Sequence, residues 1–222
     1  MNGGLSIGRC ALWVLVWVGF MLLYTALDVA VWRRVAPKYE GYLHTLAIVV
    51  SIAVYLRLLT RATGFTVDLP GHFSLSGLLW ALGGAAVLYL LLDKGLDPVL
   101  ERIFPASEAS YQETLRTLSR APVASLLQVC VLAPVIEEIL MRGYVFDGLS
   151  ASHGSIVALL VSSLLFALLH FNMVQTLSAL VCGLIIGLIY LRTGSLLCSI
   201  LTHAGYNLVS YLTMILPLYG KP

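Results

Sequence analysis

The sequence predicts an all-α fold, a polytopic membrane bundle of about seven transmembrane helices. Hydrophobic residues make up 59% of the 222 residues and charged residues only 11%, and the mean hydropathy is +0.94. Soluble globular proteins carry about 45–50% apolar and about 25% charged residues, so the surplus apolar surface requires lipid around it. The net charge is +2 and no Lys/Arg block occurs. We therefore expect membrane lipid, and no nucleic acid, as a partner.

Three apolar runs in the N-terminal half are long enough to cross a hydrocarbon core about 30 Å thick. They occupy residues 10–32, 43–59 and 75–92. The first is too long for the apolar core of a signal peptide, which has about 7–15 residues. No clear cleavage site follows it, so we expect a retained first span.

A long polar stretch, residues 101–120, separates the two halves of the chain. Ser107 is a candidate N-cap for a short helix. Tyr111, Leu115 and Leu118 then recur with the spacing of one helical face. This pattern indicates an amphipathic helix at the membrane interface. A solvated connector is an equally weighted alternative.

Four further apolar runs occupy residues 122–146, 155–170, 174–191 and 196–218. The turns between them are short, which predicts a compact antiparallel bundle. Gly183 and Gly187 form a G-x-x-x-G pattern, which is typical of close helix packing in membranes.

The chain is expected to form one transmembrane domain, because the sequence shows no internal repeat or low-complexity tract. Its parts would be the N-terminal spans in 1–100, an interfacial connector in 101–120 and the motif-bearing helices in 121–218.

The fourth run contains two carboxylates and an arginine, Glu137, Glu138 and Arg142. A charge at membrane depth costs roughly 2.5–3.5 kcal/mol on insertion scales, so three together point to polar chemistry. Glu138 and Arg142 are four residues apart and can pair on one helix face. Glu137 lies about 100° around the helix from Glu138 and has no local partner, which favours it as a general base. A structural ion-pair cluster without catalysis is the alternative.

Polar side chains also lie on two later runs. His170 ends the fifth run, one turn after Phe166. His203 and Asn207 are four apart in the seventh, and both are costly in hydrocarbon unless they face a polar cavity. Interhelical hydrogen bonding alone is an alternative explanation for these two. The other histidines lie in or beside loops, and we expect them to be solvated: His44, His72 and His153.

If these groups converge, they form a hydrated pocket that can activate water. Glu137 and His170 would take a proton from water, and His203 and Asn207 would donate hydrogen bonds to an oxyanion. Glu137, His170 and His203 are also a known kind of zinc set, so zinc stays open as a cofactor. Neither an H-E-x-x-H metalloprotease motif nor a G-x-S-x-G serine elbow occurs in the sequence.

Three motifs on successive predicted helices carry a family resemblance: E-E-x-x-x-R, F-x-x-x-H and H-x-x-x-N. In this order, over roughly residues 121–210, they resemble the CPBP family of CAAX proteases and bacteriocin-processing proteins, also called Abi. The resemblance implies an all-helical intramembrane endopeptidase, a hydrolase often called a metalloprotease, for which a metal-free glutamate mechanism has also been argued. It implies Glu137 as the water-activating residue and His170 as its partner. It also implies an oxyanion-side pair and two supporting residues: His203 and Asn207, Glu138 and Arg142.

The implied substrate is a membrane-associated protein or peptide that is cut near its C-terminus. In members related to the eukaryotic CAAX enzyme it is an isoprenylated protein. Prokaryotic members include others with roles in bacteriocin immunity and peptide maturation. The short chain and compact loops look prokaryotic, so we expect a multi-pass protein of a prokaryotic cell membrane.

Two non-peptidase functions remain as alternatives. One is a non-catalytic immunity or peptide-binding membrane protein of the same family. The other is an ion or proton carrier that uses Glu137 and Glu138 as relay sites. Carriers often show paired or inverted repeats, which this sequence lacks.

Overall fold

The computed structural model describes residues 5–69 and 74–219, and this part of the chain is helical and contains no strand. The all-α prediction is confirmed. The α-helices are α1 Ile7–Leu27, α2 Arg33–Val35, α3 Glu40–Thr63, α4 Leu75–Leu91, α5 Asp97–Ile103, α6 Pro105–Ser119, α7 Pro122–Leu127, α8 Ala133–Glu138, α9 Asp147–His153, α10 Ser155–Ala167, α11 Met173–Thr193 and α12 Leu196–Ser210. Wider π-helical segments connect several of them: η1 Asp28–Trp32, η3 Leu92–Leu96, η4 Gln128–Leu132, η5 Ile139–Phe146 and η6 Tyr211–Ile215. Two short 3₁₀ turns complete the order: η2 Pro37–Tyr39 and η7 Leu216–Leu218.

Within the described residues, five helical stretches are long and apolar enough to cross a membrane: Ile7–Val35, Pro37–Thr63, Leu75–Ile103, Pro122–His153 and Met173–Thr193. The chain is therefore a multi-pass integral membrane protein. The predicted count of about seven is not confirmed. The helix in the fifth run, α10, has 13 residues and is about 20 Å long, which is shorter than the hydrocarbon core. The seventh run is divided among α12, η6 and η7.

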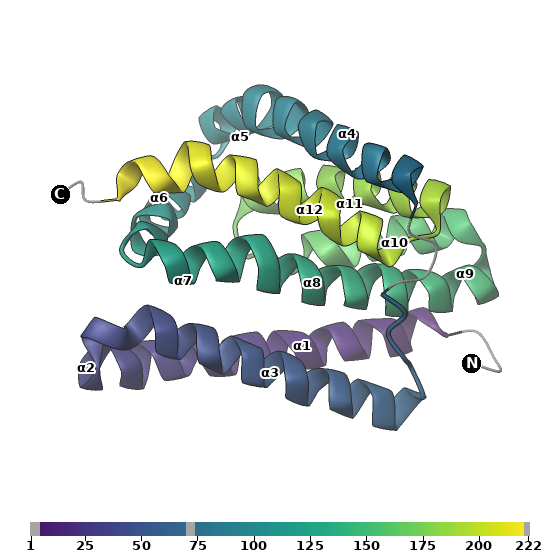
Figure 1. Cartoon of the computed structure of the whole chain (residues 1–222), viewed down its shortest axis with the longest axis horizontal. Helices are drawn as coiled ribbons and strands as arrows, with labels where there is room; N and C mark the ends of the chain where they lie inside the picture. Colours follow the sequence, from purple (N-terminus) through teal and green to yellow (C-terminus); the bar gives the residue numbers. More distant parts are fainter. Residues whose placement is uncertain (1–4, 70–73, 220–222) are drawn as a thin grey trace.

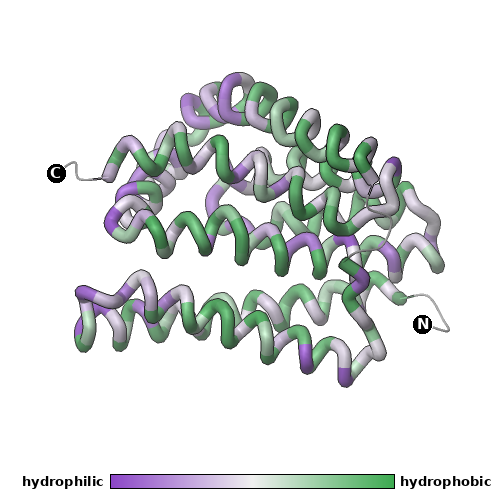
Figure 2. The backbone as a smooth tube through the Cα atoms, in the orientation of Figure 1, coloured by the Kyte–Doolittle hydropathy of each residue, from purple (hydrophilic) through white to green (hydrophobic). Residues whose placement is uncertain are grey.

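The helices form layers. Figure 1 shows α1 and α3 as an antiparallel pair at the bottom of the view, with α7 to α9 above them and α12 and α4 at the top. Hydrophilic segments gather toward the ends of the helices, for example at α2 and around α5 and α6 (Figure 2). Outward-facing leucines of α1 and α4 are more than half exposed: Leu12, Leu15, Leu79 and Leu82. Such apolar outer faces suit contact with lipid tails rather than water.

Glycine allows close contact between α10 and α11. A Cβ atom on Gly183 would lie 3.1 Å from Ser163 Cα, which is closer than real Cβ atoms normally approach a backbone. A Cβ on Gly187 would overlap the Leu159 side chain. The close packing predicted from the G-x-x-x-G pattern is therefore confirmed.

The helix that carries the acidic motif is continuous but irregular. The π segment η4 ends just before Pro134, and the π segment η5 begins just after Glu138. Proline lacks an N–H and its ring disturbs the preceding turn, so a wider turn at this point relieves the conflict. Single π turns inside α-helices are frequent at functional sites.

The polar stretch between the halves forms α6, which begins at Pro105 rather than at a Ser107 cap. The Ser107 prediction is wrong, because Pro105 itself occupies the first helical position and Phe104 precedes the helix. The Ser107 carbonyl accepts a hydrogen bond from Asn172 Nδ2 at 2.7 Å. Leu115 is buried and packs in a small cluster with Tyr211 of η6, so this stretch is a packed amphipathic helix rather than a solvated connector.

Candidate active site

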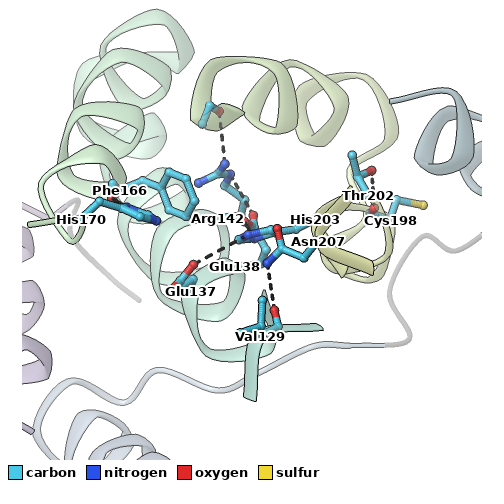
Figure 3. A network of polar contacts seen from close by, with 11 residues as sticks. Val129, Glu137, Glu138, Arg142, Phe166, His170, Cys198, Thr202, His203 and Asn207 are labelled. Atoms are coloured by element: carbon cyan, nitrogen blue, oxygen red, sulfur yellow. Dashed lines mark hydrogen bonds and ion pairs between the residues drawn. The ribbon is translucent and has the colours of Figure 1, made fainter. Parts of the chain in front are cut away.

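A cavity of about 340 Å³ lies inside the bundle. Its lining includes Glu137, His170, His203 and Asn207, which come from α8, the end of α10 and α12. Figure 3 shows these side chains directed toward a common region. The volume is within the range of about 300–1,000 Å³ that is usual for small-molecule sites. The four residues that the sequence offered as one site therefore lie on one cavity.

A fully buried ion pair, Glu138 with Arg142, lies next to the cavity. Arg142 Nε lies 3.1 Å from Glu138 Oε2, and neither side chain is exposed. The geometry is not that of a hydrogen bond, so charge attraction holds this contact. Arg142 Nη2 also donates to the Gly183 carbonyl at 3.1 Å, and the guanidinium lies 5.5 Å from the centre of the Phe166 ring. One arginine thus connects three helices.

Glu138 has a second partner that sequence spacing did not reveal. Its Oε1 lies 3.0 Å from His203 Nδ1, across 65 residues of chain. An ionised carboxylate only accepts hydrogen bonds, so Nδ1 is the donor. This fixes the imidazole ring and leaves Nε2 turned toward Glu137, whose Oε2 is 3.9 Å away. Glu138 therefore orients His203, and Arg142 holds Glu138.

The F-x-x-x-H spacing has a physical reason in this structure. His170 Nδ1 lies 3.2 Å from the Phe166 carbonyl, four residues earlier. A carbonyl oxygen can only accept, so Nδ1 carries the hydrogen and Nε2 of the neutral ring keeps a free lone pair. The Phe166 ring packs edge-on against both imidazoles, with centroid distances of 5.3 Å to His170 and 5.5 Å to His203.

Asn207 lies one turn after His203 on α12, and its Nδ2 donates to the Val129 carbonyl at 2.9 Å. Pro134 explains why this carbonyl is free. The Ala133 N–H bonds to Gln128 in the π-helical register, so the next partner for Val129 would be residue 134. Proline has no N–H, and Asn207 satisfies the carbonyl instead. One amide hydrogen of Asn207 remains for a ligand.

A comparison with known families matched part of the chain. Residues 119–209 match the family model for the type II CAAX prenyl endopeptidase Rce1-like proteins. All three motifs lie inside this stretch, hereafter the Rce1-like segment, so the resemblance seen in the sequence is confirmed there. No curated protein and no solved structure matches the chain.

Residues outside the Rce1-like segment complete the cavity. Trp17, Met21 and Tyr24 of α1 recur with helical spacing, and His44 and Ile48 of α3 lie one turn apart. These five residues line the wall that α1 and α3 contribute. Sequence reasoning missed this wall, although the spacing of the aromatic residues on the first span was a usable signal.

The prediction that His44 is solvated is wrong. Its side chain is 21% exposed, its ring packs edge-on against Tyr24 with centroids 5.4 Å apart, and its Nδ1 lies 3.7 Å from Asp28 Oδ1. His44 is four residues inside α3, where the partner helix covers it, rather than in a loop. His153 is exposed as expected. His72 lies outside the described residues.

The zinc set offered by the sequence does not form a coordination group. Glu137, His170 and His203 line one cavity, but no three His, Cys, Asp or Glu side chains in residues 5–69 and 74–219 are arranged to hold a metal ion. His203 Nδ1 already donates to Glu138, and His170 Nδ1 to a backbone carbonyl.

Proposed function

We propose that the chain is an intramembrane endopeptidase that hydrolyses a peptide bond near the C-terminus of a membrane-associated protein or peptide. The observation that carries this proposal is the pairing of Glu137 Oε2 with His203 Nε2 at 3.9 Å on the cavity in the bundle. Distances between catalytic groups are often long without substrate and shorten in the complex. The match of the Rce1-like segment supports the same reaction class.

The proposed reaction begins with a water molecule between Glu137 and His170. The Glu137 carboxylate takes a proton from the water while His170 Nε2 accepts its other hydrogen bond, and the water oxygen attacks the carbonyl carbon. The oxyanion receives hydrogen bonds from the Nε2–H of protonated His203 and from the free amide hydrogen of Asn207. Glu137 then returns its proton to the amide nitrogen, the C–N bond breaks, and a carboxylic acid and an amine leave.

We infer that the substrate reaches the cavity from the membrane. The wall from α1 and α3 is largely apolar, and Trp17, Met21 and Ile48 offer contact surface for a hydrophobic part of the substrate. An isoprenylated CAAX-type C-terminus fits this description and the description of the matched family. We place the protein in a prokaryotic cell membrane.

We also propose how the shorter helices sit in the bilayer. His203 and Asn207 lie on α12, and His170 lies just after α10. Both helices pack against spanning helices, so both would lie at membrane depth and bring the number of embedded elements to seven. The amphipathic α6 would lie at the interface, at the end of the cavity that Tyr111 and Leu115 line.

A hydrolysis assay tests the proposed function. Purified protein in lipid nanodiscs is incubated in H₂¹⁸O with membrane-anchored peptides, with and without a prenyl group, and the products are analysed by mass spectrometry. We expect cleavage near the C-terminus with one ¹⁸O atom in the new carboxylate. Peptide binding without any cleavage would contradict the proposal and support the non-catalytic peptide-binding function.

Removal of metal is expected to leave this activity unchanged, because the proposed steps use side chains only. The measurement is kcat before and after exhaustive chelator treatment, with the zinc content determined on the same samples. Stoichiometric zinc, together with activity that is lost to the chelator and restored by zinc, would contradict the metal-free reaction.

A further inference from the structure

The helix α4 lies against α12 through small residues, although α4 is outside the Rce1-like segment. A Cβ atom on Gly84 would lie 3.0 Å from the Thr202 methyl carbon, and one on Gly205 would lie 3.2 Å from Ala85 Cβ. Figure 1 shows the two helices side by side along the top of the bundle. This contact brings the end of α4 close to the part of α12 that carries His203 and Asn207.

A carboxylate at this end holds two residues of α12. Asp93 lies in the π segment η3 that continues α4. Its Oδ1 accepts a hydrogen bond from the Tyr206 hydroxyl at 2.8 Å, and its Oδ2 accepts one from the Ser210 hydroxyl at 2.6 Å. Tyr206 and Ser210 are one helical turn apart and share a face. One side chain therefore spans the turn that contains Asn207.

The two hydrogen bonds to Asp93 are expected to be stronger than hydrogen bonds between neutral groups. Hydrogen bonds to an ionised acceptor are roughly twice as strong as neutral ones. The neighbouring Lys94 ammonium lies over the Tyr89 ring, 5.0 Å from its centre. Among the described residues no ion pair to Asp93 is found, so the two hydroxyl groups are its close partners.

The same stretch also reaches the next helix. Asp97, four residues after Asp93, accepts a hydrogen bond from Ser178 of α11. Tyr206, Ser210 and Ser178 all line the active-site cavity. Asp93 and Asp97 thus accept hydrogen bonds from the cavity-lining faces of α12 and α11. Both aspartates belong to one segment of the N-terminal half, η3 and the start of α5.

We propose that Asp93 is a positioning residue for the peptidase reaction, and this rests on the proposed function. The α12 turn is held at three points: His203 on Glu138, Asn207 on Val129, and Tyr206 with Ser210 on Asp93. The first two contacts come from the acidic-motif helix alone. Asp93 supplies a contact from a different helical segment, η3, and sets the rotation of α12 about its axis. Asn207 and His203 then face the scissile carbonyl.

The test compares two Asp→Ala variants that each break a tyrosine–aspartate hydrogen bond. Asp93→Ala removes the contact to Tyr206, and the control Asp147→Ala removes a contact of the same 2.8 Å length from Tyr190, away from the active-site cavity. We expect Asp93→Ala to lower kcat about 10- to 100-fold with KM changed less than about threefold. The control is expected to change kcat less than about twofold.

Non-additivity distinguishes positioning from a general loss of stability. If Asp93 acts through Asn207, Asp93→Ala lowers kcat less than about twofold further in an Asn207→Ala background. An unchanged kcat for Asp93→Ala, or fully additive losses, would overturn the proposal. Tyr206→Phe breaks one of the two hydrogen bonds and leaves Ser210 in place, so it provides the same comparison if Asp93→Ala does not fold.

Hydrogen exchange provides a readout that does not depend on cleavage. Asp93→Ala is expected to speed amide exchange in residues 203–210 of nanodisc-embedded protein while exchange in α10 stays unchanged. Unchanged exchange in residues 203–210 would overturn the positioning role. If the wild-type protein cleaves no peptide, but Asp93→Ala still exchanges faster than wild type in residues 203–210, the proposed function is refuted. The positioning of α12 by Asp93 then still stands.

Discussion

Glu137→Gln is expected to abolish peptide hydrolysis while the protein stays folded. The amide has the shape of the carboxylate but cannot take a proton from water, and general acid–base catalysis contributes about 10²–10⁴-fold. Glu137 Oε2 lies 3.9 Å from His203 Nε2, while Arg142 pairs with Glu138 instead. The substitution therefore leaves the buried ion pair intact. The measurements are kcat on a cleaved peptide and the midpoint of thermal unfolding.

Glu113→Gln is the matched control for this prediction, because Glu113 is exposed on α6 and the chemical change is identical. It is expected to retain wild-type kcat. If Glu137→Gln keeps more than half of the wild-type activity, Glu137 is not the base. If it unfolds at a much lower temperature than the control, its role is structural.

The contacts that the sequence predicted well are those within a single helix. Glu138 and Arg142, and His203 and Asn207, are each four residues apart within one helix, so helical geometry places each pair on one face. The hydrogen bond from His203 to Glu138 could not be predicted in this way. It depends on how far α8 and α12 are rotated about their axes, which packing of whole helices determines.

The count of spans was less predictable for a related reason. A hydropathy run records apolar composition but not where the backbone leaves the helix. The fifth run continues to His170, whereas α10 ends at Ala167 and the next three residues form a turn toward α11. This turn places the His170 ring next to the Phe166 carbonyl. The helix end that shortens the span is thus part of the site.

The N-terminal half shows the limit of motif-based reasoning most clearly. It contains no motif of the Rce1-like segment, and the match begins at residue 119. Nevertheless Tyr24 and His44 line the cavity, and Asp93 holds α12. His44 and Asp93 lie at the ends of apolar runs, where a polar side chain is ordinarily explained by solvent, and Tyr24 lies within the first run. Only the packed structure shows that they face the cavity or a partner helix.

Arg142→Ala is expected to prevent accumulation of folded protein, which is the largest stability effect that we predict. Removing one partner of a buried ion pair costs about 3–5 kcal/mol, because the other charge is left without compensation. Arg142 and Glu138 are both fully buried, and the Gly183 carbonyl would also lose its donor. Arg34→Ala is the control, since Arg34 is exposed. The measurement is the yield of monodisperse protein after detergent extraction and its unfolding midpoint.

A double variant separates stability from catalysis at this pair. In Glu138→Gln/Arg142→Met no charge is left buried, and replacement of a buried ion pair by uncharged groups of similar volume is often close to neutral for stability. We expect the double variant to accumulate as folded protein. It should still hydrolyse peptide at least about tenfold more slowly, because His203 loses the carboxylate that orients its ring. Wild-type activity in this variant would show that Glu138 serves stability alone, and normal yield of Arg142→Ala would show that the pair is not needed for folding.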